Sequence, residues 1–363
     1  MSIKKRHINI PVFIPHEGCP NNCVFCNQHT ITQTDGGSAR DIRPEIDACL
    51  ETVNTDECEC EIAFFGGSFT GIPREDMVRL LETAHEYIKN GKVKSLRLST
   101  RPDYISPEIL DILEKYGVRH IELGIQSMDD KVLAASGRGH TAITTENACR
   151  MIIERGFSLT GQMMVGLPGA TPESEIATAE KICNMGADSA RIYPTVVFFG
   201  TELCEMSKRG EYTPLTNREA VERCASVYKV FAEKGVTLLR IGLQSGEGLR
   251  DGNIYGGANH SAIGEMAVSK YYLDIMREIC QKMTESGYLK KGDKVVLTVF
   301  CAEGETSKVA GQKRVNKEKI TELFSDRGIR ILNIKIKESK ETDKNSVKIT
   351  AEIIKSEVTD SCT

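Results

Sequence analysis

Three cysteines near the N-terminus are the residues whose types and spacing most clearly indicate chemistry. Cys19, Cys23 and Cys26 lie in the stretch HEGCPNNCVFCNQHT, separated by three and then two residues, and Phe25 precedes the third. Thiolates are soft ligands that suit iron–sulfur clusters and zinc. Three cysteines would leave one iron of a four-iron cluster with an open position. Zinc is the alternative, because His29 follows Cys26 by three residues and would complete a Cys3His site.

The elements that must position these cysteines alternate between strand and helix patterns. The apolar run over 8–14 directly precedes the cysteines, and further strands are predicted at 61–67, 94–100, 119–126, 158–165, 189–194 and 236–243. Helical spacing separates them, and Ser106-Pro107 and Thr171-Pro172 are typical helix starts. The alternation predicts an α/β protein with a partial (β/α)6 barrel of the TIM type. A doubly wound sheet is the structural alternative.

Polar and glycine-rich segments fall at the predicted strand ends, where barrels of this kind bind ligands. Gly66-Gly67-Ser68-Phe69-Thr70 ends the second strand, and its glycines allow a ligand to approach the backbone closely. Period two places Ser99 and Arg101 on one face of the third strand, together with Arg97.

On the fourth strand the same period places Glu122 and Gln126 on the face opposite the aliphatic side chains. Glu122 would then be a buried carboxylate that needs a partner. We expect that partner to be one of three arginines, namely Arg97, Arg101 or Arg191.

The cysteine spacing, with an aromatic residue before the third cysteine, resembles the cluster motif of the radical S-adenosylmethionine (SAM) superfamily. This resemblance implies that Cys19, Cys23 and Cys26 hold a [4Fe-4S] cluster whose fourth iron is chelated by SAM. It implies that one electron, from a donor such as flavodoxin or ferredoxin, splits SAM into methionine and a 5′-deoxyadenosyl radical. That radical abstracts hydrogen from a substrate.

Four later segments, IELGIQS, RGHT, GLPG and IYPTVVFFGTELCEM, extend the resemblance over roughly residues 10–245. Together they are similar to the radical SAM domain of the Elongator catalytic subunit and its bacterial relatives. This implies that the segment from Gly66 to Thr70 binds the amino end of SAM. It also implies a set of further residues around SAM: Ser99, Arg101, Glu122, Gln126, Arg138 and Gln162.

Three departures from the Elongator pattern limit what carries over. Ser99 stands where the Elongator subunit usually has glutamate, so the SAM contact at this position is altered or lost. The first two cysteines are closer together than in that subunit. The chain is also too short for the acetyltransferase domain that follows there. No residue is assigned as catalytic, and we expect His140 to be a structural histidine, with a proton donor as the alternative.

Composition indicates a soluble cytoplasmic protein without a membrane partner. The 363 residues contain 13 cysteines and neither a signal-peptide pattern nor an 18-residue apolar run, which favours reduced thiols in the cytosol. The predicted domains are the barrel (1–245), a glycine-rich closing segment with a helix (246–290) and a small basic β-α-β-β module (291–363). Residues 287–355 contain 16 Lys and Arg against 10 Asp and Glu. This suggests an anionic partner, with a solvated lysine-rich surface as the alternative.

These observations lead to one favoured function and two alternatives. The favoured function is a radical SAM enzyme that acts on RNA, such as a tRNA base. Support from aromatic stacking is weak, because the chain has no Trp and Phe324 is the only aromatic residue after position 300. The first alternative is a radical SAM oxidoreductase that acts on a small metabolite, as in anaerobic porphyrin synthesis. The second is a zinc-binding module without enzymatic activity.

Overall fold

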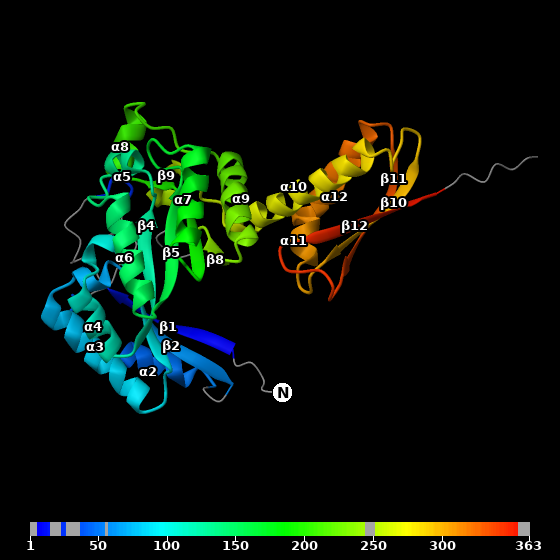
Figure 1. The fold of residues 1–363 in the computed structure, drawn as a ribbon. Coiled ribbons are helices and arrows are strands. Elements are labelled where there is room, and N and C mark those ends of the chain that lie inside the picture. The colour runs from blue at the N-terminus through cyan, green and yellow to red at the C-terminus, as the bar shows by residue number, and fades with distance from the viewer. Residues whose placement is uncertain (1–5, 15–22, 27–36, 55–56, 244–250, 355–363) are drawn as a thin grey trace, which may run out of the picture. The chain divides into compact units, whose positions relative to one another are not determined.

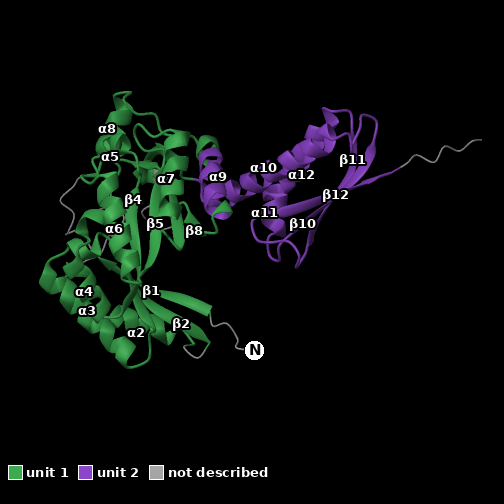
Figure 2. Ribbon diagram, viewed as in Figure 1, with its two compact units in different colours: residues 1–220, 233–259 green, residues 221–232, 260–363 purple. Residues whose placement is uncertain are grey.

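The chain forms two compact units in the computed structural model, which describes residues 6–14, 23–26, 37–54, 57–243 and 251–354. The first unit contains residues 1–220 and 233–259, and the second contains residues 221–232 and 260–363 (Figure 2). The two units are defined by contacts between residues and do not show which segments fold independently. The domain boundaries predicted at 245 and 290 therefore stay predictions.

A seven-stranded parallel sheet is the centre of the first unit (Figure 1). Its strands lie side by side in chain order: β1 (Arg6–Ile14), β2 (Cys58–Gly66), β3 (Ser95–Thr100), β4 (Val118–Gln126), β5 (Ser158–Val165), β6 (Ser189–Pro194) and β8 (Thr237–Ile241). The order never reverses, so the sheet has no topological switch point, which excludes the doubly wound alternative. The predicted partial barrel is confirmed.

Helices connect these strands and cover the apolar side of the sheet. They are α2 (Arg43–Glu51), α3 (Arg74–Lys89), α4 (Pro107–Lys115), α5 (Asp130–Ala135), α6 (Ala142–Glu154), α7 (Pro172–Asn184) and α8 (Glu202–Lys208). Both predicted proline starts occur, because Ser106 caps α4 and Thr171 forms a capping box with Ser174 at the start of α7.

The helices pack closely because one face of each central strand is aliphatic. On β4, Ile121, Leu123 and Ile125 are fully buried. On β5, a Cβ at Gly161 would lie only 2.5 Å from the Cγ2 atom of Ile182 on α7, so glycine is needed there for the helix to reach the sheet. The opposite, polar face of the strands is therefore left to line the inside of the partial barrel.

A short antiparallel ribbon in the first unit was not predicted. It pairs β7 (Val196–Phe198) with β9 (Ile254–Gly257), and β9 lies inside the glycine-rich closing segment, where no strand was predicted. A Cβ at Gly257 would lie 2.6 Å from the carbonyl oxygen of Thr195, so glycine permits this pairing. Strands of three and four residues are too short to show a period of two.

The second unit packs helices against one face of a three-stranded sheet. Its elements are residues 221–232 of α9 (Asn217–Glu233), then α10 (Ile263–Glu285), β10 (Lys294–Cys301), α11 (Thr306–Ala310), α12 (Val315–Ser325), β11 (Arg330–Glu338) and β12 (Val347–Ile353). The central strand β10 pairs in parallel with β11 and antiparallel with β12. None of the helices in the described ranges is long and apolar enough to cross a membrane.

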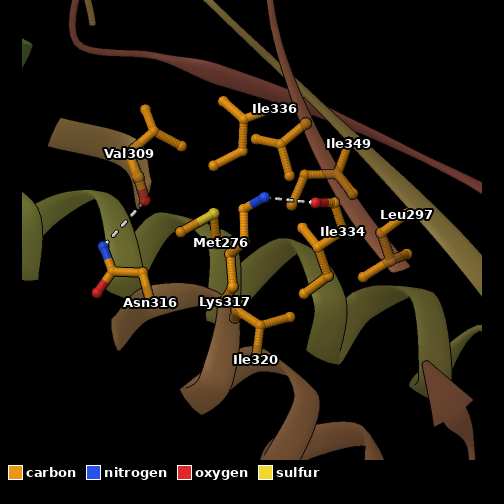
Figure 3. A pocket seen from close by; sticks show the side chains of 10 residues that line it. Met276, Leu297, Val309, Asn316, Lys317, Ile320, Ile334, Ile336 and Ile349 are labelled. Atoms are coloured by element: carbon orange, nitrogen blue, oxygen red, sulfur yellow. Dashed lines mark hydrogen bonds between the residues drawn. The ribbon is translucent and has the colours of Figure 1, made fainter. Parts of the chain in front are cut away.

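Aliphatic side chains fill the space between the helices and the sheet of this unit (Figure 3). A gap of only about 10 Å³ remains among them. The stem of Lys317 lines this gap, and its ammonium donates a hydrogen bond to the carbonyl oxygen of Ile334 at 2.7 Å. The inner side of the sheet is therefore a packed core rather than a ligand site.

Candidate active site at the ends of the barrel strands

Two of the three predicted cluster ligands form a tight turn beyond the end of β1. The backbone N–H of Cys26 donates a hydrogen bond to the carbonyl oxygen of Cys23 at 2.9 Å. Cys23 is buried and Cys26 is half-buried. Cys19 and His29 lie outside the described residues.

The residues between these cysteines anchor the turn to the first unit. The N–H of Val24 donates to the carbonyl oxygen of Ser136 at 3.1 Å, and its own carbonyl oxygen accepts from Leu203 at 2.8 Å. Val24 and Phe25 also pack against a small apolar cluster that includes Leu203 and Cys204. The aromatic residue of the motif therefore holds the turn in place through burial.

Two buried arginines converge on the sulfur of Cys23. The Nη1 atoms of Arg138 and Arg101 lie 3.4 Å and 3.9 Å from Cys23 Sγ. Arg138 Nη2 donates to the carbonyl oxygen of Gly124 at 2.7 Å, and Arg101 Nη2 donates to the carbonyl oxygen of Arg138. Cations and N–H donors around a thiolate stabilise its negative charge and tune the potential of a cluster bound to it. The residues present therefore fit a thiolate-bound cluster.

Asp103 holds Arg101 in this position through two hydrogen bonds, both of 2.9 Å. Burial alone would raise the pKa of the Asp103 carboxyl group, but the hydrogen bond and charge of Arg101 lower it below its usual value. An ionised Asp103 leaves Arg101 charged and oriented toward the sulfur.

The predicted SAM segment turns sharply at the end of β2, beside the end of β1. Gly66 has φ +104°, and a Cβ there would lie 2.6 Å from the carbonyl oxygen of Ile14. That same oxygen accepts the N–H of Gly67 at 3.0 Å. Only glycine fits this position, because both its backbone angle and the available space exclude a side chain. The segment is thereby fixed next to the strand that leads into the cysteines.

The rest of the segment is buried and linked to β3. Phe69 is fully buried and stacks on Phe64, with ring centroids 4.4 Å apart. Thr70 Oγ1 lies 2.6 Å from Thr100 Oγ1 and donates to the carbonyl oxygen of Tyr104 at 3.1 Å. Phe69–Gly71 form a short helical turn, and Ser68 immediately precedes it. These contacts make Phe69 and Thr70 structural supports of the turn.

Three of the predicted SAM contacts gather around Gly124 on β4. Gln162 Nε2 donates to Gln126 Oε1 at 3.0 Å. A β-bulge separates Gly124 from Gln126, and Gln126 has the left-handed φ of 66°. A Cβ at Gly124 would lie 3.1 Å from Gln126 Nε2 and 3.5 Å from Arg138 Nη2. The bulge thus turns Gln126 toward the same point as Gln162 and Arg138.

Glu122 lies deeper in the barrel and is paired with one of the three arginines considered from the sequence. Arg191 Nε donates to Glu122 Oε2 at 2.8 Å, and both side chains are largely buried. Ser99 is opposite Glu122 in the sheet register. Burial, and then the Glu122 charge, raise the pKa of Tyr193, which is on β6 like Arg191.

A further charged cluster near the amino ends of the strands was missed from the sequence. Glu61 is 2% exposed and contacts Ser95 Oγ and His120 Nδ1, both at 2.5 Å, as well as His7 Nε2 at 3.2 Å and Arg97 Nη1 at 3.9 Å. Burial opposes its ionisation, but the hydrogen bonds from His120 and Ser95 and the nearby charges lower its pKa. In the sequence, Glu61 is only the first residue of the strand predicted at 61–67, and nothing near it indicates a charged cluster.

His140 is buried behind the two arginines. Neither ring nitrogen has a well-formed hydrogen bond among the described residues. Burial, and then the charges of Arg138 and Arg101, lower its pKa to about 4. His140 is therefore neutral at physiological pH.

Family models match most of the chain. The Radical SAM superfamily model matches residues 13–182, and the model of the Radical_SAM C-terminal domain matches residues 187–273.

Two curated relatives and one solved structure are also similar. A tRNA uridine(34) acetyltransferase of Methanocaldococcus infernus is 32% identical over 58% of this chain and 40% of its own length. A protein of Methanocaldococcus jannaschii without an assigned function is 30% identical over 60% of this chain and 70% of its own length. The structure of Methanocaldococcus infernus Elp3 with an N-terminal deletion has a TM-score of 0.58 and 23% identity, over 78% of this chain and 64% of that one. The last comparison bears on the fold alone.

Proposed function

Because the chain belongs to the radical SAM superfamily and is a radical SAM enzyme, we propose that Cys19, Cys23 and Cys26 hold a [4Fe-4S] cluster. The cluster would supply one electron, and SAM the 5′-deoxyadenosyl radical that takes hydrogen from the substrate. The observation that carries this assignment is the approach of two buried guanidinium groups to Cys23 Sγ, at 3.4 Å and 3.9 Å. Guanidinium N–H donors that surround a cysteine sulfur stabilise a thiolate and tune the potential of a cluster bound to it.

The surrounding residues bind and orient SAM in this proposal. The turn from Gly66 to Thr70 is fixed to the end of β1, the strand that precedes the cysteines in the chain, and we assign its backbone to the SAM amino group. The joined amides of Gln126 and Gln162 offer donors and acceptors for the rest of SAM. Glu122 is engaged by Arg191, so we assign it to positioning rather than to direct contact. Ser99, beside it, can contribute only a hydroxyl group.

We propose RNA as the substrate class, with a tRNA base as the reacting group. The proposal is supported by the archaeal relative that is named for tRNA uridine. It is also supported by the excess of lysine and arginine in residues 287–355. The acetyl transfer in that relative's name is not part of the proposal, because the chain spans 40% of the relative's length. A reduced flavodoxin or ferredoxin is the proposed electron donor.

The cluster is tested by replacing one ligand and one unrelated cysteine. After anaerobic reconstitution we expect the parent and Cys183→Ser to contain iron and sulfide in equal amounts, and Cys23→Ser to lose most of both. Cys183 is a matched control because it is a half-buried cysteine on α7, away from the cysteine turn. Equal iron in Cys23→Ser, or zinc without sulfide in the parent, would overturn the assignment.

The substrate class is tested with dithionite-reduced parent protein and SAM. We expect added bulk tRNA to increase the formation of 5′-deoxyadenosine and a small-metabolite fraction not to do so. Stimulation by the metabolite fraction alone would replace RNA with a small-molecule substrate while leaving the radical chemistry intact.

A further inference from the structure

The three-stranded sheet of the second unit has one covered face and one open face. Residues 295, 297, 299 and 301 of β10 are almost completely buried on the side of the helices. Figure 3 shows Leu297 there, among the isoleucines of the neighbouring strands. The alternate residues Val296, Thr298 and Phe300 are only half-buried and point to the other side. Among the described residues of this unit, the helices lie on the covered side of the sheet.

The strand register gives the open face a strong positive charge. Residues paired across strands share a face, so Phe300 lies between Lys337 of β11 and Lys348 of β12. Further along, Thr298 pairs with Lys335, and Lys294 pairs with Arg330.

The open face therefore carries five exposed cations against one carboxylate, Glu352, which is opposite Val296. Over the part of the chain that the structure describes, none of these cations has an ion-pair partner, although Lys348 Nζ contacts the carbonyl oxygen of Glu341 at 3.2 Å. Unpaired lysines around an accessible aromatic ring suit an anion that also has a flat, apolar surface.

We propose that this open face, centred on Phe300, binds single-stranded RNA. Unpaired bases stack on aromatic side chains of sheet surfaces, while flanking lysines neutralise the phosphates. Phe300 supplies the ring, and Lys337 and Lys348 lie one strand away on either side, about 5 Å from it. The inference deepens the proposed function and rests on RNA being the substrate class: the second unit would hold an unpaired RNA segment outside the barrel.

Protection of the sheet edges explains only part of this surface. Lysines on edge strands discourage pairing with other chains, and β11 and β12 are both edge strands. Such protection does not call for an aromatic residue on the central strand, nor for lysines on both sides of it. Because charge reversal keeps a charge on each edge strand, edge protection alone predicts no change in RNA affinity, whereas RNA binding predicts a loss of affinity in a protein that stays monomeric.

The test compares full-length, anaerobically reconstituted variants for binding to a labelled single-stranded oligouridylate and to an RNA duplex of equal length. We expect Phe300→Ala to weaken binding of the oligouridylate by roughly 5- to 150-fold, as the loss of one stacked base would, and Phe300→Tyr to retain most of it. The double variant Lys337→Glu/Lys348→Glu should lower the slope of log affinity against log salt by at least about 1.4, at about 0.7 for each lost phosphate contact.

The matched control is Lys282→Glu/Lys319→Glu, which changes the charge equally on α10 and α12. It should bind like the parent protein. Equal affinity in the parent and in both open-face variants would overturn the inference. So would equally strong binding of the duplex, or binding of phosphatidylserine vesicles in place of RNA.

A readout of chemistry separates this inference from the proposed function. If tRNA still increases 5′-deoxyadenosine formation while the open-face variants bind RNA normally, the inference fails and the proposed function stands. If the parent neither binds RNA nor responds to tRNA, both fail. If RNA binding is lost in the open-face variants while the iron content is unchanged, the inference is supported.

Discussion

His140 makes the stability of the first unit depend on pH in a way that a single substitution should remove. The ring is 6% exposed and close to two arginines, and its pKa is lowered from 6.5 to about 4. The unfolded chain takes up a proton near pH 6.5, whereas the folded chain does not do so until about pH 4. The unfolded state therefore binds more protons over this window, and stability falls as the pH falls through it.

The size of the effect follows from these two pKa values. Lowering the pKa from 6.5 to about 4 corresponds to about 3 kcal/mol when the pH lies below both values. At pH 5.0 the loss of unfolding free energy from this group alone is about 2 kcal/mol, and at pH 7.5 it is close to zero. Titration of His140 is therefore predicted to lower the free energy of unfolding by about 2 kcal/mol between pH 7.5 and pH 5.0.

The variant His140→Leu replaces the imidazole with an apolar side chain of similar size that cannot titrate. We expect the free energy of unfolding of the parent to fall by about 2 kcal/mol more than that of the variant between pH 7.5 and 5.0. Urea unfolding of the reconstituted protein measures this, with circular dichroism for the whole chain and visible absorbance for the cluster-holding unit. The exposed His260, replaced by Gln, is the control and should follow the parent. Equal acid losses in the parent and His140→Leu would refute the reasoning.

Two other sites give sharp expectations. Glu122→Gln leaves Arg191 buried without a charge partner and should lower the free energy of unfolding by about 3–5 kcal/mol in urea melts. The control is Glu205→Gln, in an exposed ion pair, which should lower the free energy of unfolding by less than about 1 kcal/mol. Gly66→Ala meets both an unfavourable φ and the Ile14 carbonyl oxygen and should abolish SAM binding measured by equilibrium dialysis. Gly91→Ala, at φ +70° with nothing within 4 Å, should bind SAM normally; similar binding by both variants would contradict the steric argument.

The sequence was sufficient to predict the helices and strands that have a clear hydrophobic pattern or a clear helix-start signal. The strands at 158–165 and 189–194 were predicted with the bounds that the structure shows, because aliphatic side chains make their burial evident. Ser106-Pro107 and Thr171-Pro172 marked helix starts correctly, since capping is a local interaction. The five-residue helix α11 and the ribbon of β7 and β9 depend on contacts between distant segments and carried no such signal.

The arrangement of charges was harder to predict, because a strand pattern gives the face of a residue but not its partner. Glu122 was expected to meet one of three arginines, and only the register of the four strands from β3 to β6 selects Arg191. The contacts of Glu61 come from three other strands, so its burial as a charged group had no local sign. Phe324, the aromatic residue considered for RNA, is fully buried, whereas Phe300 faces outward, which only the pairing of β10 reveals.

The fixed positions of Arg101 and Arg138 have a consequence for how the cysteine site would respond to oxidation by air. Arg101 is held by the Asp103 carboxylate and the carbonyl oxygen of Arg138, and Arg138 by the carbonyl oxygen of Gly124. Neither guanidinium can therefore swing away when its sulfur partner changes. A chain whose iron has been lost to oxygen would keep two fixed positive charges beside an oxidised cysteine. Because a sulfinate or sulfonate on Cys23 is an anion, the two cations would hold it in place. Such a chain would fail to take up a new cluster, although the barrel itself stays folded.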